Sequence, residues 1–70
     1  MTTKIYHHDT TFTKEHHPNL ARIKVKGDKW CRHHCMDLHV SKMKDNSVIF
    51  YFRSQSDLTA FRIGFDVYDI

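Results

Sequence analysis

The sequence predicts a small α+β domain, in which a mixed or antiparallel sheet of three to four strands has two helices packed on one face. Three features of the chain predict this class. Some segments alternate apolar and polar residues or are β-branched and aromatic throughout, as strands are. Other segments carry apolar residues at helical spacing behind a capping residue. A chain of 70 residues has room for a single core, so residues 1–70 are expected to form one domain.

The elements are expected in the order (β)-β-α-β-α-β, and the bracketed first strand has the weakest signal. Residues 3–8 favour an edge strand, and a polar connection from Asp9 to Asn19 follows. Pro18 stops regular structure there, because the residue before a proline is restricted to extended backbone. Residues 1–19 as a whole are polar and rich in histidine.

Residues 20–26 are predicted to form a strand with one charged face. Apolar residues alternate strictly with basic ones here, in the run Ala21-Arg22-Ile23-Lys24-Val25-Lys26. Gly27 breaks this strand, and Asp28 caps a helix that begins at Lys29 and extends to about His39. A four-residue spacing within that helix predicts a stripe that faces the sheet, made of Trp30, His34 and Leu38.

The strongest strand signal lies in the second half of the chain. Residues 48–53 are β-branched and aromatic on both faces, which predicts a central strand. Residues 41–47 before it are polar, have no period and end in turn-forming residues. This stretch is therefore expected to be a connection.

A second helix is predicted directly after that strand. Ser54 and Asp57 form a capping box at its start. Gly64 is expected to end it by adopting positive φ. Residues 65–70 alternate apolar and polar side chains, which predicts a last strand.

Composition favours a cytoplasmic protein that works by binding. The net charge of +3 permits attraction to nucleic acid or to an acidic protein surface without demanding a polyanion. No apolar run approaches the roughly 18 residues that cross a bilayer, and Met1-Thr2-Thr3-Lys4 lacks the apolar stretch of a secretion signal. No membrane association is expected, and the two cysteines are expected to be reduced.

Cysteine and histidine side chains in the predicted first helix raise the question of a metal ion. Zinc accepts such ligands, and the candidates are Cys31, Cys35, His34 and His39. Residues eight apart on a straight helix are separated by roughly 12 Å, so a site would also need the pair His7-His8 or His16-His17. The alternative is that both cysteines are small buried apolar groups. No cofactor is expected on that interpretation.

The chain is expected not to be an enzyme. A nucleophilic Cys31 or Cys35 would need a base and an oxyanion site, and no Gly-rich turn offers such a site. Asp57 is interpreted as a helix cap, while Asp66 and Asp69 lie near the end of the chain. No complete catalytic motif is therefore present in the sequence.

A basic edge is the most prominent candidate for a contact surface. It joins the charged face of the strand predicted at residues 20–26 to the start of the following helix, through Arg22, Lys24, Lys26, Lys29 and Arg32. Such an edge could meet phosphates or acidic side chains. The alternative is a solvated strand face whose lysines discourage edge pairing. Tyr6 and Tyr68 are expected to complete a protein-binding surface, because tyrosine and arginine dominate interface energetics.

The run from Phe50 to Phe65 resembles a pattern in small uncharacterised accessory proteins of tailed bacteriophages, of the kind that take over the host. An aromatic strand, Phe50-Tyr51-Phe52, is followed by the Ser54 to Asp57 cap and a helix with Ala60-Phe61. An upstream Trp30-Cys31 pair extends the resemblance to residues 30–65. The resemblance implies a phage-encoded protein that binds and often inhibits a host enzyme or defence factor, and it carries over no catalytic residue.

The expected function is therefore non-catalytic binding of a host protein, such as a nuclease, polymerase or defence factor, with inhibition or modulation as the result. A nucleic-acid-binding protein that uses the basic edge from Arg22 to Lys29 is the first alternative. A zinc-stabilised interaction module is the second. A homodimer through an unpaired edge strand is compatible with each of these.

Overall fold

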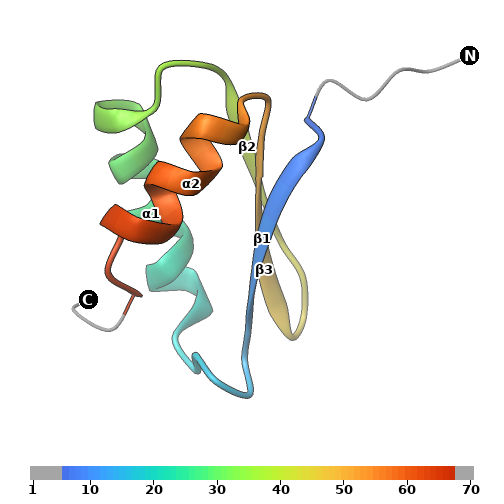
Figure 1. Ribbon diagram of the computed structural model, residues 1–70. Helices are drawn as coiled ribbons and strands as arrows, with labels where there is room; N and C mark the ends of the chain where they lie inside the picture. The colour runs from blue at the N-terminus through green and yellow to red at the C-terminus, as the bar shows by residue number, and fades with distance from the viewer. Residues whose placement is uncertain (1–5, 68–70) are drawn as a thin grey trace, which may run out of the picture.

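Within residues 6–67, the part of the chain that the computed structural model describes, the elements follow one another in the order β-α-β-β-α (Figure 1). They are β1 (His8–Thr13), α1 (Leu20–His34), β2 (His39–Met43), β3 (Ser47–Phe52) and α2 (Gln55–Gly64). Neither helix combines the length and the apolar character that crossing a membrane requires.

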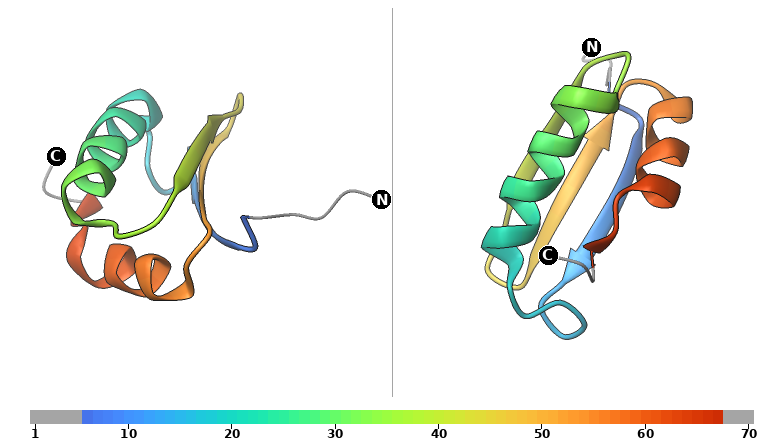
Figure 2. Two further views of the ribbon diagram at one scale, coloured as in Figure 1. Left: turned by 90° about the horizontal axis from the view of Figure 1, so that it is seen from above. Right: turned by 90° about the vertical axis from the view of Figure 1, so that its left-hand side faces the viewer.

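The three strands form one antiparallel sheet in the order β1-β3-β2. The predicted central strand is confirmed, because β3 pairs on both sides, with Phe50 opposite Thr10 of β1 and Ser41 of β2. Both helices lie on one face of the sheet (Figure 2). Helix α1 packs against β2 and β3, and α2 packs against β1 and β3. The predicted fold class, a small α+β sheet with two helices on one face, is thus confirmed.

The core is built from the helix-facing side of β3. Val48, Phe50 and Phe52 are completely buried, whereas Ile49 and Tyr51 point to the uncovered face and are half-buried. The helices close the core with apolar side chains, chiefly Leu20, Ile23 and Cys31 of α1 and Phe61 of α2. Each large side chain buried in this way contributes roughly 1.5–3 kcal/mol of transfer free energy.

Gly27 lets α1 approach the sheet closely. A Cβ atom at this position would lie 2.4 Å from Cζ of the buried Phe50 ring. Glycine costs a helix interior about 1 kcal/mol relative to alanine, and the close approach to Phe50 offsets that cost.

The second helix and the serine half of the predicted capping box are confirmed, whereas the Asp57 carboxylate accepts from the backbone N–H groups of Met36 and Asp37 and does not complete the box. The Ser54 side chain accepts from the backbone N–H of Asp57 at 3.4 Å, and α2 runs to Gly64. The prediction of positive φ at Gly64 is wrong, since no described residue has positive φ. Gly64 instead lies against the Trp30 ring, whose Cζ2 atom would be 2.8 Å from an added Cβ.

The predicted strand at residues 20–26 is wrong, because this segment is the first half of α1. Apolar and basic residues alternate here over only a few positions, and the same segment also fits a helical period. Leu20, Ile23, Gly27 and Cys31 recur three and four apart, and all four are buried against the sheet. Asp28 lies inside the helix and does not cap it.

The predicted helix end at His39 and the predicted connection at residues 41–47 are also wrong. Helix α1 ends at His34, and residues 39–43 form β2, joined to β3 by a tight turn. β2 is polar, so its sequence carries only a weak strand signal. Its backbone pairs with the edge of β3 that does not pair with β1.

The ends of the chain differ from prediction as well. β1 occupies residues 8–13, of which 9–13 were expected to form a polar connection. Of the strand predicted at 3–8, residues 3–5 lie outside the described residues, residues 6 and 7 are irregular, and only His8 is in a strand. Phe65 and Asp66 are irregular and Val67 lies in a 3₁₀ turn, so this part of the predicted last strand is wrong. Residues 68–70 lie outside the described residues.

Candidate contact surface on helix α1

The predicted strand face that carried the basic edge does not exist, because residues 20–26 are helical. Successive residues on a helix are rotated by about 100°, so Arg22 and Lys24 point in nearly opposite directions. The helix instead gathers a different set of exposed side chains on its solvent side. We call this set the α1 outer face, and it consists of Ala21, Arg22, Val25, Lys26, Lys29, Arg32 and His33.

The α1 outer face holds four of the five basic residues predicted to bind a partner. Arg22, Lys26, Lys29 and Arg32 are all exposed, and none of them forms an ion pair with another residue between 6 and 67. From Arg22 to His33 the face extends about 16 Å along the axis at 1.5 Å per residue. The face contains no acidic residue, so its charge is uniformly positive.

Lys24 is the basic residue that the fold removes from this surface. Its Nζ lies 3.2 Å from Oδ2 of Asp28, one helical turn on. Ser41 of β2 also donates its hydroxyl to Asp28, at 2.8 Å, and Nε2 of His39 lies 3.7 Å from Oδ1 of the same carboxylate. Asp28 therefore links α1 to β2, and Lys24 and His39 belong to that link.

A shallow hollow of about 330 Å³ adjoins the α1 outer face. It is lined by Lys26, Lys29, Trp30, His33, His34, Phe65 and Asp66. The Trp30 ring is half-buried, and its centroid lies 4.6 Å from that of His34, with the two rings tilted by 32°. It meets the buried Phe61 edge-on at 5.4 Å. Sequence reasoning missed this association of an aromatic ring with lysines. Only the helical phase, with Trp30 four residues after Lys26, reveals it.

The two tyrosines expected at the contact surface do not join it. Tyr6 is half-buried and lies just before β1, the strand covered by α2 rather than by α1. Tyr68 lies outside the described residues. The described part of the surface is therefore basic, with Val25 as its apolar member, 65% exposed.

The fold does not gather the four candidate metal ligands into one site. Cys31 is buried in the core, while His34 is exposed and lies against the Trp30 ring. Cys35 follows the end of α1, and His39 lies in β2 beside Asp28. Among residues 6–67 no cluster of three or more cysteine, histidine or acidic side chains has metal-binding geometry.

The cysteines have the environment of packing residues. Burial, followed by a hydrogen bond to the Cys35 thiol, raises the pKa of the Cys31 thiol far above its usual range. Burial also raises the pKa of Cys35, although the bond from Cys31 opposes this shift. A raised pKa disfavours the thiolate, which is the form that attacks electrophiles and binds metals.

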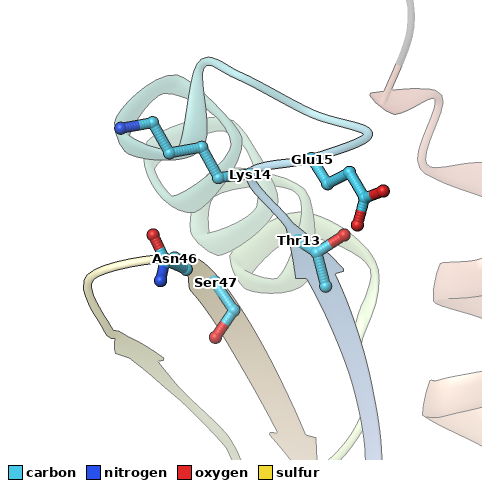
Figure 3. Close-up of a pocket in the computed structure, with 5 residues that line it drawn as sticks. All are labelled: Thr13, Lys14, Glu15, Asn46 and Ser47. Atoms are coloured by element: carbon cyan, nitrogen blue, oxygen red, sulfur yellow. The ribbon is translucent and has the colours of Figure 1, made fainter.

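A second hollow, of about 570 Å³, lies where β1 ends beside the turn between β2 and β3. Its lining residues are Thr13, Lys14, Glu15, Asn46 and Ser47, and the side chains of Lys14 and Glu15 point away from one another (Figure 3). Lys14 donates its backbone N–H to the carbonyl of Asn46 at 2.7 Å. This hollow has no net charge and no aromatic wall, so it lacks the features that distinguish the α1 outer face.

Comparison of the chain with protein-family models, curated proteins and solved structures finds no match. The surface chemistry of the α1 outer face is therefore the basis for the functional proposal.

Proposed function

We propose that this chain is a small non-catalytic protein of the phage accessory type, which binds a host protein through the α1 outer face and thereby inhibits or modulates it. The observation that carries the proposal is a continuous exposed face with four basic side chains, none of them paired with a residue between 6 and 67. Such a face is complementary to an acidic protein surface, where opposite potentials speed encounter and select the partner.

A protein partner is favoured over a polyanion by the centre of the face. Val25 is 65% exposed between Arg22 and Lys29, so an apolar side chain lies among the charges. Protein interfaces combine arginine with desolvated apolar groups, whereas phosphate contacts use charge alone. The modest net charge of +3 agrees with this preference.

Nucleic-acid binding is the second candidate, and the hollow beside Trp30 favours it. Aromatic rings next to basic side chains form platforms on which unpaired bases stack. Lys26, Lys29 and His33 line the same hollow as Trp30. Asp66 also lines the hollow, and its carboxylate disfavours a phosphate there.

The proposed function is tested by recovery of partners from a bacterial lysate. The wild-type chain is compared with the double variant Lys26→Glu, Lys29→Glu and with the matched control Lys42→Glu, Lys44→Glu. The control makes the same change in net charge at exposed lysines of β2 and its turn. We expect a stoichiometric protein with the wild type and the control, and its loss with the first double variant. Equal recovery by all three, or no protein partner at all, would contradict the proposal.

A fluorescence titration with a single-stranded oligonucleotide decides between the two candidates. If four basic side chains contact phosphates, the logarithm of the binding constant falls against the logarithm of salt with a slope of about −3. Under the leading proposal, binding to the oligonucleotide is weak and the same double variant changes it little. A steep salt slope that the double variant abolishes would establish the second candidate instead.

A further inference from the structure

Among residues 6–67 no strand pairs with the outer edge of β1, and this edge is a second surface with defined chemistry. The N–H of Lys14 donates to the carbonyl of Asn46, one position beyond Thr13 and Ser47, the last pair of the β1–β3 register. Hydrogen-bonded and non-hydrogen-bonded pairs alternate along an antiparallel ladder. The backbone N–H and C=O groups of the even-numbered residues of β1 therefore point toward β3. The backbone groups of Asp9 and Thr11 and the N–H of Thr13 therefore point away from β3, whereas the Thr13 carbonyl already accepts from the N–H groups of His16 and His17, at 3.1 and 2.8 Å.

Three of the devices that protect sheet edges from other strands are absent from β1. These devices are lysine, proline and bulges. β1 contains neither lysine nor proline, and its pairing with β3 continues over six positions without a bulge. The opposite edge differs, because β2 carries an exposed Lys42 and its Ser41 is bonded to Asp28 of α1.

An apolar hollow of about 410 Å³ adjoins this unprotected edge. Thr10 and Phe12 of β1 form one wall, and Phe61, Ile63, Phe65 and Val67 contribute to the other. Ile63 is 81% exposed at this place. Arg62 and Asp66 also line the hollow with opposite charges, so it favours an uncharged apolar side chain.

We propose that the β1 edge and this hollow together bind an extended, uncharged segment of a protein partner by β-strand addition. The main chain of the segment pairs with the outward backbone groups of Asp9 and Thr11 and with the N–H of Thr13. Side chains of a strand alternate between its two faces, so every second side chain of the segment enters the hollow. Main-chain pairing supplies affinity in this mode of recognition, and pockets for alternate side chains supply specificity.

A segment without a helix of its own fits this edge better than a second copy of the chain. Helix α2 packs on β1 and lies beside it (Figure 2). Antiparallel pairing of two β1 strands about a two-fold axis would place both α2 helices on the same face of the joined sheet, beside the same hollow. This surface is separate from the α1 outer face, so the inference does not depend on the proposed function.

The test uses amide hydrogen exchange of the full chain with a blocked hexapeptide in which threonine and valine alternate. We expect the peptide to slow exchange at Asp9, Thr11 and Thr13 by about tenfold or more, and to shift the resonances of Ile63. The same peptide with every second amide methylated should have no effect, because it cannot complete the ladder.

Two substitutions at one position sharpen this test. Thr11→Pro removes an outward N–H without removing a hydrogen bond to β3, and it should abolish the effect of the peptide. Thr11→Val keeps the backbone donor and should preserve it. Ile63→Ser, on an exposed side chain, should weaken the response without unfolding the chain.

Three results would overturn the inference. The peptide could leave exchange at the three amides unchanged. The amides could already exchange slowly in a monomer without peptide, which would show that the chain covers its own edge. Sedimentation could reveal a dimer whose formation protects the same amides, which would identify a second copy as the occupant.

Discussion

The two helices cover the same face of the sheet but expose very different outer surfaces. Helix α2 begins with a side-chain cap at Ser54 and buries Asp57 and Phe61. Helix α1 has no side-chain cap and no acidic residue in its first turn, and it exposes a continuous basic face. Both helices bury an apolar stripe, so the difference between them lies in the polar residues. Those of α2 hold the fold together, while those of the α1 outer face are free to meet a partner.

Asp57 shows how far α2 is committed to structure. Its backbone N–H donates to the capping Ser54 side chain, and its carboxylate accepts from the backbone N–H groups of Met36 and Asp37, at 3.1 and 2.8 Å. One side chain thereby positions the loop between α1 and β2. In contrast, no described residue bonds to the basic groups of the α1 outer face. Substitution of the buried α2 residues Asp57 and Phe61 should therefore lower stability, and substitutions on the α1 outer face should lower binding alone.

The largest effect is expected from Phe61→Ala. The Phe61 ring lies within 5.4 Å of the rings of Phe50, Phe52, Trp30 and Phe65. Truncation of a buried phenylalanine costs about 3–5 kcal/mol, measured as the free energy of unfolding in urea. The control Ile63→Ala, at an exposed position of the same helix, should stay within about 0.5 kcal/mol. Similar losses for both variants would contradict the role given to α2.

Asp57→Ala should have the next largest effect. It leaves the amides of Met36 and Asp37 without their acceptor, and hydrogen bonds to a charged group contribute about 1.5–3 kcal/mol each. We expect a total loss of about 2–4 kcal/mol in the same assay, because the two bonds share one carboxylate and water replaces part of the interaction. Ser54→Ala removes only the capping oxygen and should cost about 1 kcal/mol. A smaller loss for Asp57→Ala than for Ser54→Ala would show that the carboxylate does not hold the loop.

The inner face of α1 predicts a pH dependence. Unfolded thiols lose their protons near pH 8.5, whereas Cys31 keeps its proton in the fold because burial raises its pKa. The unfolded state then binds fewer protons, so stability should fall as the pH rises above about 8.5, by up to about 1.4 kcal/mol per pH unit for this thiol. Urea unfolding between pH 7 and about 9.5 measures the slope. Cys31→Ala should reduce it, and an unchanged slope would mean that Cys31 is not the cause.

The smallest effect on stability is expected on the α1 outer face itself. Lys26→Glu with Lys29→Glu changes exposed residues outside any described ion pair, and the free energy of unfolding should change by no more than about 0.5 kcal/mol. Partner recovery should nevertheless be lost. A large loss of stability would mean that these lysines support the fold. It would contradict the claim that the polar residues of the α1 outer face serve binding rather than stability.

The sequence predicts the fold class, β3 and α2 well because the signals for these two elements are local. The β-branched and aromatic run of β3 and the Ser54 cap of α2 each specify one conformation within a few residues. Residues 20–26 fit both a two-residue and a helical period, and only burial of Leu20, Ile23 and Gly27 against the sheet selects the helix. β1 and β2 are polar strands that the edges of β3 stabilise.

The candidate site was predicted in its residues but not in its geometry. Four of the five basic residues share a surface, because positions three, four and seven apart meet on a helix. Lys24 is lost because Asp28 lies one turn after it. Trp30 and the free β1 edge could not be found from the sequence, since both depend on how distant segments pack.

Site-specific photocrosslinking in bacterial cells tests the central claim most directly. A photoreactive side chain replaces Val25 at the centre of the α1 outer face, and in a matched variant it replaces the exposed Ala60 on α2. The account predicts a covalent adduct with one protein from position 25 and little or none from position 60. No adduct at position 25, or equal yields of the same adduct from both positions, would contradict it.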